Sequence, residues 1–82
     1  MKSIVYTLTA AKALRRYANR ARTIQKKLEQ YAAEPISLAN NVKQLKGVDA
    51  ARLRVGDFRV LFRETESEIL ILDIGPRDRI YD

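Results

Sequence analysis

The residues best suited to chemistry in this chain are arginines that alternate with apolar residues over residues 52–63, RLRVGDFRVLFR. Gly56-Asp57 at the centre of this stretch is typical of a β-hairpin with a two-residue loop. Pairing the two arms around that loop places Arg54 directly opposite Arg59. Because like charges at opposed positions destabilise a sheet, we expect this pair to serve function by binding an anion above that face.

The same pairing sorts the hairpin into two faces of different chemistry. Leu53 lies opposite Val60 and Val55 opposite Phe58, so one face is apolar. The other face carries arginines, which stay charged and bind phosphate in a bidentate manner. These arginines are Arg52, Arg54, Arg59 and Arg63. We therefore predict an anion-binding face on the exposed side of a sheet.

Other candidate residues lie on either side of the hairpin. Lys43 and Lys46 precede it, Arg77 and Arg79 follow the last expected strand, and Tyr81 comes shortly after them. An aromatic ring beside arginines can stack on an unpaired base, as in the recognition of single-stranded RNA. We interpret these residues as a site for a phosphate and its neighbouring nucleotides.

Each candidate residue also has an ordinary structural explanation, and the sequence does not decide between the functional and the structural explanation. Arg59 could pair with Asp73 on the next strand. Arg77 and Arg79 alternate with aspartates and could form surface ion pairs, which contribute little. Tyr81 could only cap the core, and the lysines could be solvated loop residues. The pattern by itself indicates an anion-binding face and does not identify RNA or its cleavage.

The composition narrows the chemistry further. The 82 residues carry a net charge of +6 with a pI near 10.0, which favours a polyanion or an acidic protein as partner. The absence of histidine excludes His-based triads and the usual zinc sites, so acid–base chemistry must use carboxylate, Tyr, Lys or Arg. Without cysteine there is no disulfide or thiolate chemistry.

The first half of the sequence predicts a strand followed by helix. Residues 2–8 alternate as a strand, and Thr9 is a plausible helix N-cap. Apolar residues then recur at spacings of three and four over residues 10–33, which by pattern alone is one helix of about six turns. A break near Asn19 into two antiparallel helices is the alternative, and its local signal is weak.

The second half predicts a loop and an antiparallel sheet. Residues 36–50 are expected to be irregular, and the strand after the hairpin to span residues 68–75. A register with Phe62 opposite Leu70 gathers the apolar residues on one face, puts Arg59 opposite Asp73 and leaves Ile71 on the arginine face. The economical fold is α+β, a single domain over residues 1–82 with helices on the apolar face of the sheet. No stretch suits a membrane span or a signal peptide, so we expect a cytoplasmic protein.

Three segments of the sequence match a known family. They are LKG at 45–47, RLRVGDFRVLF at 52–62 and ILDIGPRDRIY at 71–81. In these segments, and in the order of its elements, the chain resembles the RelE/ParE superfamily of bacterial toxins from type II toxin–antitoxin pairs, and it looks most similar to the RelE branch. The resemblance covers nearly the whole chain. It implies an N-terminal strand, a helical hairpin and then an antiparallel sheet, similar to microbial ribonucleases.

The resemblance also implies an activity and partners. RelE-like toxins cleave messenger RNA, typically in the ribosomal A site, by attack of the ribose 2′-hydroxyl on the adjacent phosphate. No metal or cofactor is implied. A cognate antitoxin wraps the toxin and carries the DNA-binding segment of a repressor complex, so contact with DNA is only indirect.

Residue roles carry over by position in the matching motifs. Arg52 would act near the 2′-hydroxyl, Arg54 would hold phosphate, and Arg59 would stabilise charge on the scissile phosphate. Arg77 would assist the leaving oxygen, and Tyr81 would stack on or orient the substrate. The chain departs from the family where Pro76 stands, since many relatives have His or Lys there. Arg52 is also a poor general base, so Lys43, Lys46 or the ribosome would have to supply one.

Two other functions fit the same fold. One is gyrase poisoning by a ParE-like toxin, which is a protein-binding function. The other is a non-catalytic toxin that survives as an antitoxin-bound corepressor, which the missing histidine and Pro76 make reasonable.

Overall fold

The elements of the fold follow one another as a strand, helices and then strands. The computed structural model describes residues 1–80. The order is β1 (Ser3–Tyr6), α1 (Leu8–Arg16), α2 (Ala18–Ala33), a 3₁₀ helix η1 (Pro35–Asn41), β2 (Val42–Gln44), β3 (Ala51–Val55), β4 (Phe58–Glu64) and β5 (Glu68–Pro76). The α+β class is confirmed. The segment expected to be irregular holds η1 and the short strand β2.

The helical hairpin that the resemblance implies is confirmed, and the single helix expected from the pattern alone is wrong. The break lies at Tyr17, two residues before Asn19. Tyr17 leaves helical geometry at φ −108° and ψ 49°, and its ring meets Phe58 of β4 edge-on with ring centroids 5.0 Å apart. The apolar period runs unbroken through this point, so periodicity alone could not locate the break. The N-cap is Thr7 and not Thr9, because the Thr7 hydroxyl accepts the Ala10 N–H at 3.1 Å.

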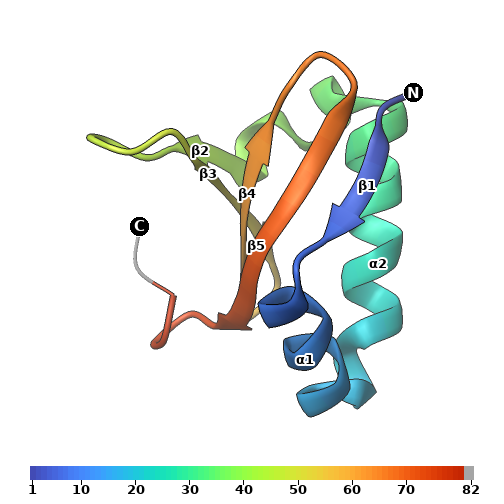
Figure 1. The fold of residues 1–82 in the computed structure, drawn as a ribbon, viewed down its shortest axis with the longest axis vertical. Helices are drawn as coiled ribbons and strands as arrows, with labels where there is room; N and C mark the ends of the chain where they lie inside the picture. Colours follow the sequence, from blue (N-terminus) through green and yellow to red (C-terminus); the bar gives the residue numbers. More distant parts are fainter. Residues whose placement is uncertain (81–82) are drawn as a thin grey trace.

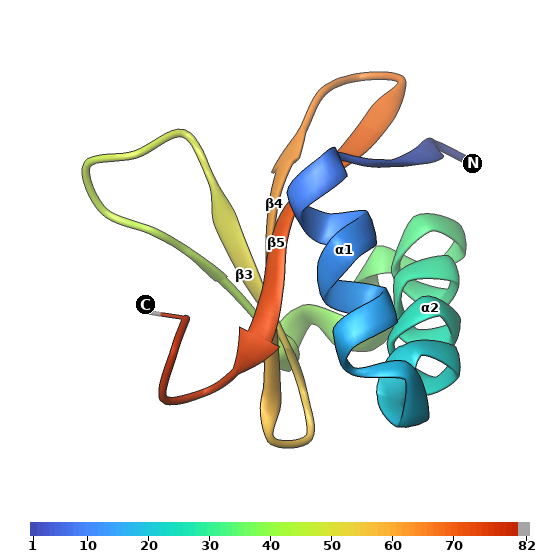
Figure 2. The same ribbon diagram turned by 60° about the horizontal axis from the view of Figure 1, so that its bottom comes forward.

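All five strands form one sheet in the order β1-β5-β4-β3-β2 (Figure 1). β1 pairs with β5 in parallel, and the other pairs are antiparallel. The helices α1 and α2 cover one face, and the β2–β3 connection and the C-terminal segment lie on the other side of the sheet (Figure 2). The second face is therefore left open by the helices.

The hairpin register is confirmed. Leu53 pairs with Val60, Arg54 with Arg59 and Val55 with Phe58, and Gly56 takes the positive φ of 59° that the tight turn requires.

The predicted register between β4 and β5 is wrong. Phe62 lies opposite Ile71, and a bulge then shifts the pairing, so that Leu61 faces Asp73 and Arg59 faces Gly75. The bulge moves Ile71 to the helix face, where it is fully buried. One extra residue in one strand exchanges the two faces beyond it, and alternation in the sequence carries no sign of that insertion.

The core lies between the sheet and the helices. The expected apolar residues of the hairpin are buried, including Leu53, Val60 and Phe62, and they pack with Ile24 and Leu28 of α2. Among residues 1–80, no helix has both the length and the apolar character needed to cross a membrane.

Candidate functional site

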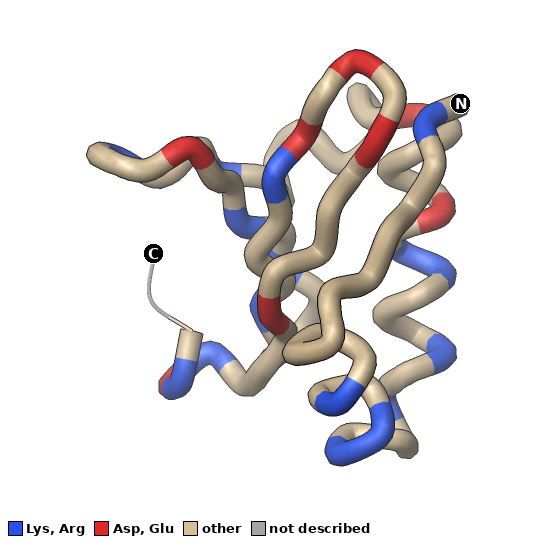
Figure 3. Tube along the Cα trace, in the orientation of Figure 1, with Lys and Arg blue, Asp and Glu red and all other residues tan. Residues whose placement is uncertain are grey.

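Basic side chains from three neighbouring strands share the open face. On β2, Lys43 pairs with Arg52 of β3, and one row further along Arg54 of β3 pairs with Arg59 of β4. We call these four residues the arginine face. The tube drawing shows Lys and Arg positions along these strands. Asp and Glu positions cluster at the β4–β5 turn and also occur on the β2–β3 connection and near the end of β5 (Figure 3). The predicted pairing of Arg54 with Arg59 is confirmed, whereas Lys43, which was expected in an irregular loop, lies on β2 opposite Arg52.

The members of the arginine face differ in how firmly they are held. Arg59 is half-buried, and its Nη1 donates to the carbonyls of Gly56 at 3.2 Å and Phe58 at 3.1 Å. Arg54 and Lys43 are exposed, and Arg52 is half-buried. The bonds of Arg59 to its own turn fix the guanidinium near the hairpin tip, beside Arg54.

The alternative pairing of Arg59 with Asp73 is wrong. Because of the bulge, Asp73 faces Leu61, and its carboxylate accepts the N–H of Ile74 at 2.8 Å. Asp73 therefore does not neutralise the positive charge of Arg59.

Arg63 and Lys46 lie at the margin of the face. Arg63 Nε donates to the Asp49 carbonyl at 3.0 Å and lies 3.7 Å from the Asp49 carboxylate, an exposed pair of the kind that contributes little. Lys46 is exposed in the β2–β3 connection, next to Gly47, whose φ of 78° turns the chain. Arg63 thus contacts the connection that carries Lys46.

The C-terminal candidates separate in space. Arg77 is exposed, and its backbone N–H bonds the Asp57 carbonyl at 2.8 Å, so Arg77 lies beside the hairpin turn and Arg59's end of the face. Arg79 instead lines a pocket against α1. Within residues 1–80, neither arginine forms an ion pair with Asp78. Tyr81 lies outside the described residues.

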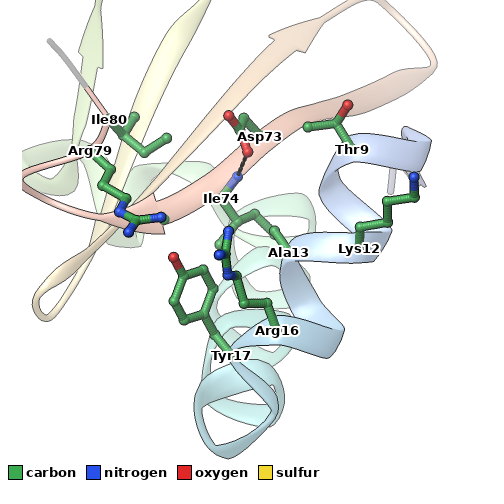
Figure 4. Close-up of a pocket in the computed structure, with 10 residues that line it drawn as sticks. Thr9, Lys12, Ala13, Arg16, Tyr17, Asp73, Ile74, Arg79 and Ile80 are labelled. Carbon is green, nitrogen blue, oxygen red and sulfur yellow. Dashed lines mark hydrogen bonds between the residues drawn. The ribbon is translucent and has the colours of Figure 1, made fainter.

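That pocket has a volume of about 480 Å³ and lies between α1 and the end of β5 (Figure 4). Lys12, Arg16 and Tyr17 line it from the helix side and Asp73 from β5. In the sequence, these helix residues fit an ordinary amphipathic helix and give no sign of a pocket. These helix residues stand out only because they line the same pocket as Arg79.

The groups with shifted pKa values lie elsewhere. The Tyr31 hydroxyl donates to Glu64 at 2.6 Å, and Lys2 Nζ lies 2.7 Å from the same carboxylate. Partial burial alone would raise the pKa of Glu64, but the hydrogen bonds from Lys2 and Tyr31 and the Lys2 charge outweigh it and hold the pKa below its usual value. Burial and the bond to Glu64 raise the pKa of Tyr31. Burial, with the charge of Glu29, also raises the pKa of Tyr6. Tyr31 and Glu64 join α2 to β4 on the helix side, away from the arginine face.

The part of the chain that the structure describes holds no group of three or more His, Cys, Asp or Glu side chains placed to bind a metal ion.

Comparison with known proteins places the chain in a family. Residues 4–81 match the sequence model described as the ParE toxin of the type II toxin–antitoxin system, parDE. The chain therefore belongs to the ParE toxin family, within the RelE/ParE superfamily, and is a toxin of a type II toxin–antitoxin system. No curated protein sequence matches it.

Solved structures give the same fold. The archaeal RelE–RelB complex from Pyrococcus horikoshii matches at 26% identity and a TM-score of 0.75, over 96% of this chain and 98% of that one. YafQ from Escherichia coli matches at 11% identity and a TM-score of 0.77 over all of both chains. The intact E. coli RelBE toxin–antitoxin complex matches at 18% identity and a TM-score of 0.72, over 94% and 98%.

Proposed function

We propose that this toxin is an endoribonuclease that cleaves messenger RNA on the ribosome without a metal or cofactor. The observation that supports this proposal is the arginine face, in which the cross-strand pairs Lys43–Arg52 and Arg54–Arg59 lie in consecutive rows on the sheet face that the helices leave open. Opposed like charges cost stability, and a bound phosphate backbone would offset that cost.

The proposed reaction is an internal transfer at phosphorus. The ribose 2′-oxygen attacks the adjacent phosphate, the bond to the 5′-oxygen breaks, and the products carry a 2′,3′-cyclic phosphate and a 5′-hydroxyl. Arg59, held by its turn carbonyls, would stabilise the charge that builds on the phosphate. Arg54 would bind the phosphate, and Arg52 would lie near the 2′-hydroxyl.

Proton transfer is assigned to groups at the rim of the face. Arg77, tethered beside the hairpin turn, would protonate or electrostatically assist the leaving 5′-oxygen. Lys43, Lys46 or a group of the ribosome would accept the 2′-hydroxyl proton. Tyr81 would stack on or orient a substrate base.

A cognate antitoxin and a cytoplasmic location complete the proposal. Two of the similar structures, RelE–RelB and RelBE, are complexes of a toxin with its antitoxin. We expect an acidic or amphipathic antitoxin segment to neutralise this basic chain, and contact with DNA to be made by the antitoxin.

The experiment is cleavage of a defined message in a cell-free translation reaction. The chain should produce 5′-hydroxyl ends within A-site codons, and Arg59→Ala should lower the rate about a hundredfold, as the loss of one charge-stabilising donor does in other enzymes. Arg22→Ala, an exposed helix residue, is the control for loss of charge. Circular dichroism would verify that both variants fold. Full activity of folded Arg59→Ala would contradict the site.

Gyrase poisoning is the second candidate, because the matching sequence model is that of ParE toxins. A gyrase-poisoning toxin would trap cleaved DNA with purified gyrase and leave the message intact. A chain that does neither, yet binds its antitoxin, would be the non-catalytic corepressor.

A further inference from the structure

The pocket between α1 and the end of β5 is separate from the arginine face. It lies at the part of β5 beyond the reach of β1, whose pairing stops at Ile71. There Asp73, Ile74 and Gly75 form the strand side of the pocket. The free edge of a strand and the side of a helix thus enclose a space of about 480 Å³, within the range of small-molecule sites.

One side of this pocket is cationic. Arg16 comes from the last turn of α1 and Arg79 from the turn after β5, and in Figure 4 their guanidinium groups lie on either side of the Tyr17 hydroxyl. Lys12 stands at the rim. Within residues 1–80, the side chains of these three cations have no hydrogen bond or ion pair. Two guanidinium groups and a hydroxyl are donors that suit a phosphate.

The other side of the pocket presents a hydrogen-bond acceptor, the carboxylate of Asp73. Asp73 uses Oδ1 to bind the Ile74 N–H at 2.8 Å, and this bond holds the carboxylate in place. Its second oxygen has no hydrogen-bond partner within the described residues. A carboxylate positioned in this way can accept hydrogen bonds from sugar hydroxyls, as in nucleotide sites elsewhere. It does not suit a second phosphate.

We propose that this pocket binds a ribose phosphate, the phosphoribosyl part of a nucleotide. The phosphate lies against Arg16, Arg79 and the Tyr17 hydroxyl, and the ribose hydroxyls bond Asp73. The ligand is either a free nucleotide or the phosphorylated end of an RNA strand. Binding here does not depend on cleavage at the arginine face.

The test is titration of the ¹⁵N-labelled chain, followed by amide chemical shifts. The probes are adenosine monophosphate, adenosine, inorganic phosphate, and an RNA trinucleotide with and without a 5′-phosphate. We expect saturable shifts around Ala13 of α1 and around Gly75 and Ile80. The monophosphate should bind more tightly than adenosine or phosphate. Tighter binding of the phosphorylated trinucleotide than of the monophosphate would identify an RNA end as the source, and the reverse a free nucleotide.

Variants on both sides of the pocket separate this site from general charge effects. Arg16→Ala and Arg79→Ala should each weaken the monophosphate about ten- to hundredfold, while Arg22→Ala leaves binding unchanged. Asp73→Asn keeps an oxygen for the Ile74 N–H, and should weaken the monophosphate but not inorganic phosphate.

Three results would overturn the proposal. They are no saturable shift up to about 10 mM monophosphate, shifts confined to β3 and β4, or equal weakening by Arg22→Ala. Cleavage of message by the unmodified chain, or its failure, is measured separately, so the two proposals stand or fall independently.

Discussion

At the scale of the residue, the Arg54–Arg59 pair sets function against stability. Two guanidinium side chains lie opposite each other on β3 and β4. The carboxylate of Asp73, which the alternation predicted to lie opposite Arg59, instead lies opposite Leu61 because of the bulge. Repulsion between directly opposed like charges costs a few tenths of a kcal/mol to about 1 kcal/mol. The arrangement makes sense where an anion is held between the two groups.

Replacing one member of this pair should stabilise the free protein. We expect Arg54→Thr to raise the free energy of unfolding by about 0.5 kcal/mol while weakening RNA binding, as measured by urea unfolding and RNA titration. Arg63→Thr is the matched control, because Arg63 faces Leu70 and so relieves no such repulsion. Equal stabilisation by both variants would assign the effect to net charge or strand propensity, and not to the pair.

At the scale of the element, Thr7 controls where α1 begins and how it meets the sheet. Its hydroxyl accepts the Ala10 N–H and donates to the Ile71 carbonyl at 2.8 Å, so the same side chain caps the helix and ties it to β5. Thr7→Ala should therefore lower the free energy of unfolding by about 1–2 kcal/mol. Thr9→Ala, at an exposed threonine without a capping bond, should change it by less than about 0.5 kcal/mol. Thr7→Ser should restore most of the loss, and a larger effect of Thr9→Ala would show that the cap is misplaced.

At the scale of the whole molecule, Glu64 joins three distant parts of the chain. Lys2 precedes β1, Tyr31 lies in the last turn of α2, and the side chains of both donate to the Glu64 carboxylate on β4. The pKa of Glu64 is held below its usual value, so its contribution to stability is present above the carboxyl's usual pKa and is lost as the pH falls through the lowered one. Because solvent screens this exposed carboxylate, the effect is small: between pH 7 and pH 2.5, we expect the unmodified chain to lose at most about 1 kcal/mol more than Glu64→Gln, by urea unfolding. Glu66→Gln, in the exposed β4–β5 turn, should behave like the unmodified chain; equal acid sensitivity of all three proteins would refute the role of Glu64.

Local sequence patterns were sufficient to predict part of the fold and part of the candidate site. The Gly56-Asp57 turn fixed the hairpin register, because a two-residue loop leaves one way to pair the arms. That register placed Arg54 opposite Arg59 and buried Leu53 and Val60. The motifs around it were enough to identify the superfamily.

The sequence by itself therefore determined the elements and chemistry that depend on neighbours along the chain: a basic hairpin with one apolar face, preceded by helix. Only the tertiary structure decided the break at Tyr17, the bulge that buries Ile71 and turns Asp73 from Arg59, and the parallel pairing of β1 with β5. It also brought Arg16 to the same pocket as Arg79. The physical reason is that these features depend on packing between segments that are distant in the sequence, such as the contact of the Tyr17 ring with Phe58. Short-range periodicity contains no information about such contacts.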